Sequence, residues 1–258
     1  MATFDELVTE ADAAPIRGWD FSWLDDRSRT APLPWSYRYT VADRVSVSRV
    51  MLDMGTGGGE WLSGLKSRPP LTVATEAWPP NVGIAATRLG TLGIPVVQVE
   101  AASDNTYNQG DQGRLPFRDA TIDLVVNRHE AFPAREVSRI LAPGGHFVTQ
   151  QVDWHNDDDF YRLLGLDTPN QPDSWLSVAR HQLERAGLVI EEARAAEERR
   201  AFYDVAAVIY YLRIIDWAVP EFSVQAFEDR LRAVQETPDA WPFVARGPRF
   251  MLVATKPA

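Results

Sequence analysis

The chain has 258 residues, and its 26 Lys and Arg against 36 Asp and Glu give a formal net charge of −10 at pH 7. This acidic balance argues against non-specific binding to nucleic acid or to an anionic membrane, because both require a basic surface. The chain contains no cysteine, which excludes disulfides, thiolate zinc sites and cysteine nucleophiles.

The N-terminal sequence MATFDELVTEADAAPIRGWD has no basic region followed by an apolar run, so it does not read as a secretory signal. No stretch of the chain approaches the ~18 consecutive apolar residues of a membrane-spanning helix. We therefore expect a cytoplasmic protein without a membrane partner. Its length predicts one or two domains.

Residues 1–45 are rich in aromatic side chains and lack the alternation of a strand, which predicts short helices and loops. From residue 47 onward, short apolar runs alternate with helical segments. The runs are VSRVMLDM (47–54), LTVATE (71–76), PVVQVE (95–100), IDLVVN (122–127) and GGHFVTQQV (144–152). This pattern favours a parallel sheet covered by helices on both faces. Later runs at 188–195 and 249–257 predict two further strands, and the aromatic stretch from Tyr203 to Phe227 predicts helix.

A glycine-rich loop follows the first of these apolar runs, in the segment MLDMGTGGGEWL (51–62). A phosphate-binding P-loop is excluded because no Lys-Ser or Lys-Thr follows the glycines. The dinucleotide motif G-x-G-x-x-G fits only in part, since Gly55 and Gly57 match but the third glycine position is Glu60. A nucleoside cofactor without a pyrophosphate, such as S-adenosylmethionine, fits the loop, and a turn without a ligand is the alternative.

A carboxylate at the end of the next strand supports a nucleoside ligand. Glu76 closes LTVATE at about 20 residues past Asp53, the spacing at which an acidic side chain holds a ribose diol. The alternative is a solvated loop glutamate.

These segments, together with GRLPFRDATIDLVVNRHEAF and EVSRILAPGGHFVTQQV, resemble class I S-adenosylmethionine-dependent methyltransferases. The similarity is to the small-molecule, methyltransferase type 11-like branch that includes quinone-pathway enzymes. It covers roughly residues 47–152 and extends to the closing RFMLVATKP. It implies a Rossmann-like, mostly parallel sheet of seven strands in the order 3-2-1-4-5-7-6, with the last strand antiparallel. On this basis we expect a lid segment at 1–45 and a methyltransferase domain at 46–258 with a helical insertion at about 203–240.

The resemblance also implies cofactor contacts, with S-adenosylmethionine as donor and S-adenosylhomocysteine as product. Asp53, Gly55, Thr56 and Gly57 would lie along the methionine part, and Glu76 would accept from the ribose hydroxyls. Asn127 would lie beside the methionine moiety. An acidic residue near the adenine is expected after the third strand; Asp104 with Asn105 is favoured by its closeness to the strand end, and Asp111 is the alternative.

Candidates for a general base are His129 and Glu130, because they follow the fourth strand at the carboxyl edge of the sheet. A purely structural role for either is the alternative. The two aromatic-rich regions are where this fold closes its acceptor pocket, so an apolar, planar substrate is expected. The predicted substrate-binding residues are Trp23, Trp35, Tyr37, Trp154, His155, Tyr210, Tyr211 and Trp217; ordinary core packing is the alternative for each.

The sequence thus predicts a methyltransferase that acts on a small aromatic or apolar metabolite, with natural-product tailoring favoured over quinone biosynthesis. Whether O, N or C receives the methyl group is left open, as is the oligomeric state. No metal site and no nucleic-acid partner are expected. A nicotinamide-dependent oxidoreductase and a non-catalytic nucleoside-binding module are the alternatives from other classes.

Overall fold

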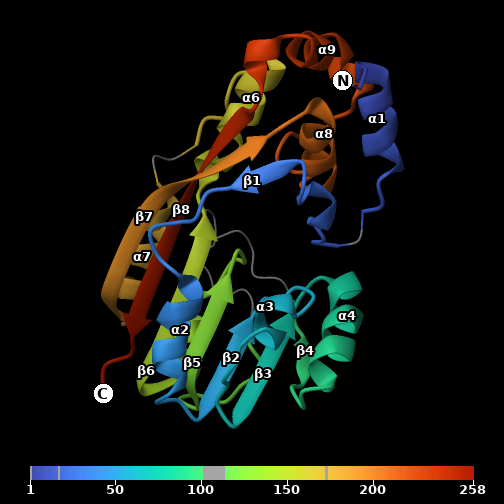
Figure 1. Ribbon diagram of the computed structural model, residues 1–258. Coiled ribbons are helices and arrows are strands. Elements are labelled where there is room, and N and C mark those ends of the chain that lie inside the picture. The colour runs from blue at the N-terminus through green and yellow to red at the C-terminus, as the bar shows by residue number, and fades with distance from the viewer. Residues whose placement is uncertain (1, 17, 101–113, 172–173) are drawn as a thin grey trace. The chain divides into compact units, whose positions relative to one another are not determined.

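The computed structural model describes residues 2–16, 18–100, 114–171 and 174–258 (Figure 1). The chain divides into two compact units. The first contains residues 1–33, 154–172 and 197–248, and the second contains residues 34–153, 173–196 and 249–258. The predicted lid segments at 1–45 and 203–240 therefore fall mainly in the first unit, together with residues 154–172, which contain the predicted substrate-binding residues Trp154 and His155. The action of the two segments as a lid stays a prediction.

The strands form one mixed sheet in the order β1-β7-β8-β6-β5-β2-β3-β4. Their bounds are β1 Ser28–Thr30, β2 Val50–Met54, β3 Leu71–Glu76, β4 Val96–Gln98, β5 Ile122–Arg128, β6 Leu141–Val152, β7 Val189–Phe202 and β8 Phe243–Thr255. Strands β2 to β6 pair in parallel, whereas β8 runs antiparallel to β6. The predicted Rossmann-like fold and its strand order are confirmed. The structure adds an eighth strand, β1, which pairs antiparallel with the end of β7.

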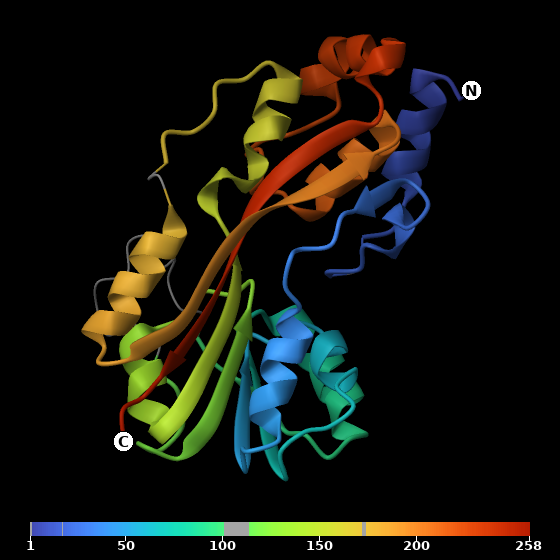
Figure 2. The same cartoon turned by 60° about the vertical axis from the view of Figure 1, so that its left-hand side comes forward.

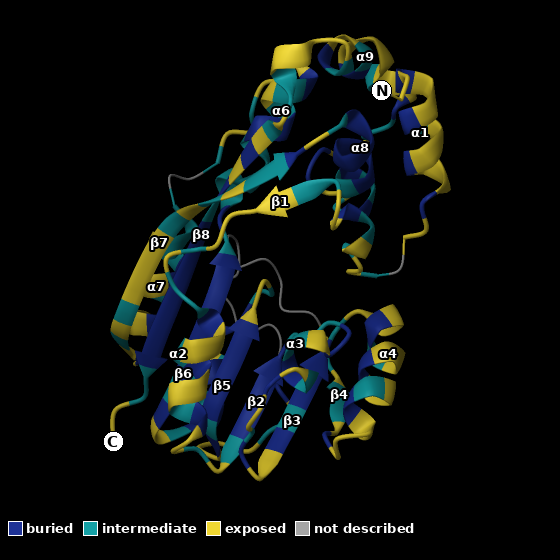
Figure 3. Cartoon of the chain, in the orientation of Figure 1, coloured by how far each residue is buried: buried dark blue, intermediate teal, exposed yellow. Residues whose placement is uncertain are grey.

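Helices cover both faces of the sheet in the second unit (Figure 2). One face carries α2 Tyr37–Val45, α3 Glu60–Ser63 and α4 Pro79–Gly90, and the other carries α5 Ala134–Ile140 and α7 Trp175–Arg185. The sheet interior explains this arrangement. Leu124 and Val126 of β5 face the core beneath α2, while Val125 between them faces the core beneath α5. Both cores are fully enclosed, so the central strands are buried on both faces (Figure 3).

The first unit has its own apolar core around α8 Val205–Ile214. This helix is apolar on nearly every side, which is typical of a helix enclosed by other elements. It packs against α1 Phe4–Ala13, with α6 Asp158–Leu164 and α9 Glu228–Gln235 completing the helices of the unit. Side-chain caps begin two of these helices: Thr3 and Glu6 form a capping box on α1, and Asp204 accepts from the backbone N–H of Ala207 on α8.

The acidic run Asp157 to Asp159 lies at the start of α6, but none of its side chains caps the helix. Instead, the buried carboxylate of Asp159 accepts from the backbone N–H and the guanidinium of Arg246. Within the described ranges, no group of three or more His, Asp or Glu side chains could hold a metal ion. In the same ranges, no helix combines the length and the apolar character that crossing a membrane requires.

Replacing glycine by alanine at two positions should change the free energy of unfolding in opposite directions. Gly83 lies inside α4 with no neighbouring atom within 4 Å of an added Cβ, so Gly83→Ala should raise the free energy of unfolding by about 0.5–1 kcal/mol. At Gly145 the added Cβ would lie 2.8 Å from the carbonyl oxygen of Ala142, so Gly145→Ala should lower it by about 1–3 kcal/mol. Urea denaturation measures both changes; effects of the same sign would contradict this account.

Candidate active site

The glycine loop leaves the carboxyl end of β2 and leads into α3. Gly55 and Gly59 have φ values of +73° and +81°, in the left-handed region that favours glycine. A Cβ on Gly59 would lie 2.9 Å from Cγ of Leu89, so glycine here also lets α4 pack closely against the loop. Glu60, where the dinucleotide motif requires glycine, is exposed and pairs with Arg88. Glycine is therefore absent at the third position of the dinucleotide motif, and α3 begins there at Glu60.

Asp53, the residue before the last of β2, is bonded to the glycine loop. It is 4% exposed, and its carboxylate accepts a hydrogen bond of 2.8 Å from the hydroxyl of Thr56. Burial raises the pKa of Asp53 to about 7; the Thr56 hydrogen bond and the Arg128 charge oppose this shift, and the Glu76 charge adds to it. Near neutral pH the carboxyl group is thus close to its midpoint of ionisation.

Glu76 joins the glycine loop to the end of β3. Its carboxylate is 5% exposed and accepts from three backbone N–H groups: Gly57 at 2.6 Å, Trp78 at 2.8 Å and Ala77 at 3.0 Å. Burial raises the pKa of Glu76 and these three bonds oppose the rise. Since a carboxylate offers about four acceptor positions, one position is open to a further donor such as a ribose hydroxyl.

Asn127 ties three strand ends together. Its side chain is fully buried, and its amide donates to the carbonyl of Met54 at 3.1 Å. Its oxygen accepts from the hydroxyl of Thr149 at 2.8 Å and from the amide of Gln151 at 2.6 Å. The side chain therefore cross-links β2, β5 and β6 just below the glycine loop, and its contact with the methionine moiety stays a prediction.

His129 and Glu130 form the turn that follows β5. His129 has a φ of +57°, and its N–H donates to the carbonyl of Gln150 at 2.9 Å. The amide of Gln151 donates to the carbonyl of Glu130 at 3.0 Å. Two adjacent residues of β6 thus fix the backbone on which both candidate bases are mounted.

The Glu130 side chain packs directly on the glycine loop. A Cβ on Gly55 would lie 2.4 Å from Cγ of Glu130, so no side chain fits at position 55 while Glu130 is in place. Burial and the charge of Glu76 raise the pKa of Glu130 to about 7. His129 behaves oppositely: desolvation of its ring and the charges of Arg128 and Arg249 hold its pKa well below its usual value. Glu130 is the better placed of the two to exchange a proton near pH 7.

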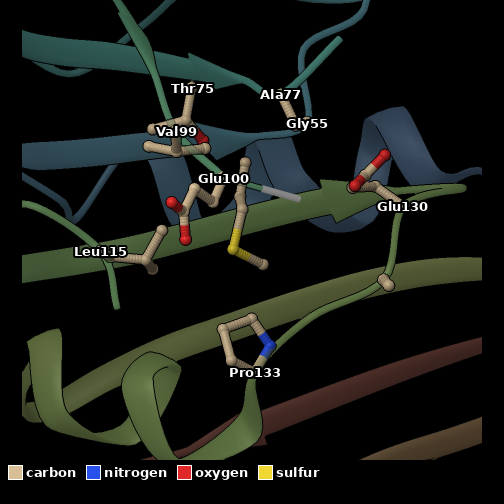
Figure 4. Close-up of a pocket in the computed structure, with 10 residues that line it drawn as sticks. Gly55, Thr75, Ala77, Val99, Glu100, Leu115, Glu130 and Pro133 are labelled. Atoms are coloured by element: carbon tan, nitrogen blue, oxygen red, sulfur yellow. The ribbon is translucent and has the colours of Figure 1, made fainter. Parts of the chain in front are cut away.

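A cavity opens between the loop, the ends of β3 and β4, and the turn after β5 (Figure 4). Apolar side chains and backbone make up most of its wall, and the carboxylates come from Glu100 and Glu130. Its lining residues are Met54, Gly55, Thr75, Ala77, Val99, Glu100, Leu115, Glu130, Ala131 and Pro133. An apolar wall with a few converging polar groups is typical of a small-molecule site.

Glu100 is a lining residue that the sequence reasoning missed. The predicted strand ran to Glu100, whereas β4 ends at Gln98, so Glu100 lies just beyond the strand end where ligand-binding side chains are found. The expectation of an acidic residue after the third predicted strand would have pointed to Glu100 if that strand had been predicted to end at Gln98. Asp104 and Asn105, favoured instead, and Asp111 lie outside the described residues.

Two predicted substrate-binding aromatics lie in the same unit as the cavity, and both are anchored. The indole N–H of Trp35 donates to Oε1 of Gln150 at 2.9 Å. The hydroxyl of Tyr37 donates to the carbonyl of Asn127 at 3.0 Å, and its ring lies 5.1 Å from that of Trp61. Tyr37 is buried, whereas Trp35 is partly open to solvent.

The other predicted aromatics belong to the first unit, where several pack in its core. The rings of Trp23 and Tyr210 lie 4.6 Å apart, and Tyr210 is 2% exposed with its hydroxyl bound to the carbonyl of Pro15. Tyr211 stacks on Phe160 at 5.1 Å. For these residues the structure shows core packing, and contact with a substrate stays a prediction.

Trp217, Trp154 and His155 lie nearer the surface of the first unit. Trp217 is 56% exposed and meets the edge of Trp19 at 5.3 Å. Trp154 and His155 are half-buried, and Nδ1 of His155 lies 3.1 Å from the carboxylate of Asp158. Their predicted contact with a substrate is likewise untested by this geometry.

Comparison with known proteins identifies the segment that carries the loop, the cavity and the central strands. Residues 52–149, less than half of the chain, match the family model described as a methyltransferase domain. This segment is similar to methyltransferase domains. The predicted resemblance to class I methyltransferases of the type 11 branch is thereby confirmed. No curated protein matched the chain.

Several solved structures share the fold of this chain. A Bacillus halodurans protein described as a candidate methyltransferase aligns with a TM-score of 0.52 and 19% identity, covering 85% of this chain and all of that one. The YcgJ protein of Bacillus subtilis aligns with a TM-score of 0.55 and 16% identity over 86% and 98% of the two chains. A structure on conversion of a disulfide into a thioacetal in echinomycin biosynthesis aligns with a TM-score of 0.51 and 14% identity over 93% and 84%.

The residues around the cavity fit the S-adenosylmethionine that the fold family implies. Ala77, Val99 and Leu115 offer an apolar wall to an adenine ring. Glu76 and Glu100 are carboxylates that can accept from hydroxyl and amino groups. Such carboxylates also complement the positive charge of a sulfonium, because a low local dielectric strengthens the attraction.

The raised pKa of Asp53 predicts how its contribution to stability varies with pH. The Asp53 carboxyl binds its proton more tightly in the folded state than in the unfolded state. Its contribution to the free energy of unfolding is therefore most favourable below the unfolded-state pKa of 3.8, and it is lost as pH rises to the folded-state pKa of about 7. Asp53→Asn cannot ionise and keeps an acceptor for Thr56. Its free energy of unfolding relative to the native chain should therefore rise between pH 4.5 and 7.5.

Urea denaturation across this pH range measures the difference. Asp12→Asn, on the exposed face of α1, is the matched control for removing one charge. A difference between Asp53→Asn and the native chain that does not change with pH would refute the assignment.

Proposed function

We propose that the chain is an S-adenosylmethionine-dependent methyltransferase that acts on a small aromatic or apolar metabolite, in natural-product tailoring. The observation that carries this proposal is the cavity beside the glycine loop, lined by Glu100 and Glu130, in the segment that matches a methyltransferase domain; the carboxylate of Glu76 is bonded to the same loop. The echinomycin-related structure supports a tailoring role, since it shares this fold. A quinone-pathway C-methyltransferase is the nearest alternative.

Different residues would bind the methionine, ribose and adenine parts of the cofactor. Gly55, Thr56 and Gly57 would lie along the methionine part, where the loop backbone allows close approach. Glu76 would use its remaining acceptor position for the ribose. Glu100 takes the place near the adenine that the sequence assigned to Asp104, because it lines the cavity at the end of β4.

S-adenosylmethionine supplies an electrophilic methyl group, which moves to the acceptor as the carbon–sulfur bond breaks. The protein's part is to hold the acceptor in line at near-attack distance and to exclude water. Glu130 would take the proton of an acceptor O–H or N–H, since its carboxylate lies against Gly55 and its pKa is about 7. Gln151 holds the backbone of this turn through the Glu130 carbonyl.

The test of the proposed function is calorimetric titration with S-adenosylhomocysteine, NAD and NADP. We expect binding of the first alone with a dissociation constant in the micromolar range, about −8 kcal/mol. Binding of a nicotinamide dinucleotide instead would favour an oxidoreductase. Binding of S-adenosylhomocysteine without transfer to any acceptor in a broad aromatic panel would favour a non-catalytic nucleoside-binding module.

Glu76→Gln should weaken S-adenosylhomocysteine binding by about 1–3 kcal/mol, because it removes a charge-assisted bond to the ribose and one acceptor for the loop. The matched control is Glu60→Gln, which removes an exposed carboxylate from the same loop and should bind as the native chain does. Circular dichroism verifies that both variants are folded. Native affinity in folded Glu76→Gln would refute the ribose assignment.

Glu130→Gln should slow turnover while S-adenosylhomocysteine affinity stays near the native value. In the native chain, kcat should rise with pH through about 7 and level off above it, because only the ionised carboxylate accepts a proton. In the variant this rise should disappear. Unchanged kcat and an unchanged pH profile would return Glu130 to a structural role.

A further inference from the structure

The register of three neighbouring strands brings two arginines to one face of the sheet. Arg128 of β5 pairs with Gln150 of β6, and two residues further along β6, Val152 pairs with Arg249 of β8. Directly paired residues, and residues two apart on one strand, share a face. Arg128, Gln150 and Arg249 therefore lie on the same face, at the carboxyl ends of β5 and β6.

This face is the one covered by α2. Val126 and Val148, each two residues before Arg128 and Gln150, pack in the core beneath that helix. The opposite face carries Asn127 and Gln151, which support the cavity and the turn of Glu130. The arginines thus lie next to the candidate active site, on the other face of the sheet from Asn127 and Gln151.

The charge of Arg128 is available to a ligand. Arg128 is exposed, and in the described part of the chain no hydrogen bond or ion pair fixes its guanidinium. Its charge acts on Asp53, whose buried carboxylate is already bonded to Thr56. Arg249 is 8% exposed, and its charge and that of Arg128 both act on His129. Two positive charges therefore flank one short stretch of the sheet edge.

An aromatic ring borders the same place. The N–H of Trp35 is fixed to the side chain of Gln150, which lies between the two arginines in the sheet register. The indole is only half-buried, so part of its ring is open to contact. A guanidinium and a partly open aromatic ring that border the same glutamine suit a planar ring that bears an anionic group, through ion pairing and stacking.

We propose that Arg128 and Arg249, with Trp35 and Gln150, form an acceptor subsite for the carboxylate of an aromatic acid. This inference rests on the proposed function and specifies its substrate class. The subsite would orient the ring by its charged end, leaving the nucleophilic end to be aligned at the cavity. Arg128 is a specificity-determining residue on this account, since it would touch the acceptor and not the transferred methyl group.

The experiment is calorimetric titration of three aromatic carboxylates, benzoate, indole-3-carboxylate and 4-hydroxyphenylacetate, and of their neutral amides, in the presence of S-adenosylhomocysteine. The native chain should bind at least one carboxylate about tenfold more tightly than its amide. Arg128→Gln should abolish this preference without weakening the amide, and Arg128→Lys should restore part of it. Arg118→Gln, which removes an exposed arginine of the same unit, should leave the preference intact.

A second titration separates the acceptor's carboxylate from that of the cofactor. S-adenosylhomocysteine carries an amino-acid carboxylate and 5′-methylthioadenosine lacks it. Arg128→Gln should bind both as the native chain does. Selective weakening of S-adenosylhomocysteine would assign Arg128 to the cofactor and overturn the subsite.

Other outcomes decide the remaining possibilities. Equal binding of every carboxylate and its amide, or no binding of any carboxylate, would overturn the subsite, as would an equal effect of Arg118→Gln. If S-adenosylhomocysteine itself does not bind, the proposed function fails. The carboxylate titration on the protein alone still tests the subsite, because loss of the preference in Arg128→Gln would uphold it.

Discussion

The candidate site depends on one buried amide that holds three strand ends in register. Parallel strands end at the same edge of a sheet, but the backbone hydrogen bonds between them do not fix the positions of the loops that follow the strands. Asn127 supplies this link by bonding to Met54, Thr149 and Gln151 inside the core. Because these bonds are buried, breaking any one leaves an unsatisfied polar group, and the edge is rigid for that reason.

Electrostatic repulsion is the second constraint on this edge. Asp53, Glu76 and Glu130 lie close together where water is scarce, and burial raises the pKa of each of them. The backbone N–H groups around Glu76 and the charge of Arg128 near Asp53 offset only part of the cost. A ligand with a positive centre would offset more of it, so the same arrangement that strains the free protein favours a sulfonium cofactor.

Apolar periodicity located the central strands from sequence, and family resemblance supplied their order, which periodicity could not have given. Strand β7 was predicted too short because its second half carries the charged run Glu-Glu-Arg-Arg at residues 197–200 and no apolar run. Glu100 was missed because strand ends are the least certain part of such a prediction. The contact of Glu130 with Gly55 joins residues far apart in the chain, and no local pattern encodes it.

Two consecutive glutamines of β6 show how the sheet separates the two parts of the site. Side chains alternate between faces along a strand, so Gln150 and Gln151 point in opposite directions. Gln150 fixes Trp35 on the face of the arginines, whereas Gln151 fixes Asn127 and the Glu130 turn on the other. A shift of this strand by one residue would exchange the two faces and lose both contacts at once. The register of β6 therefore couples the position of Trp35 to the position of the Glu130 turn.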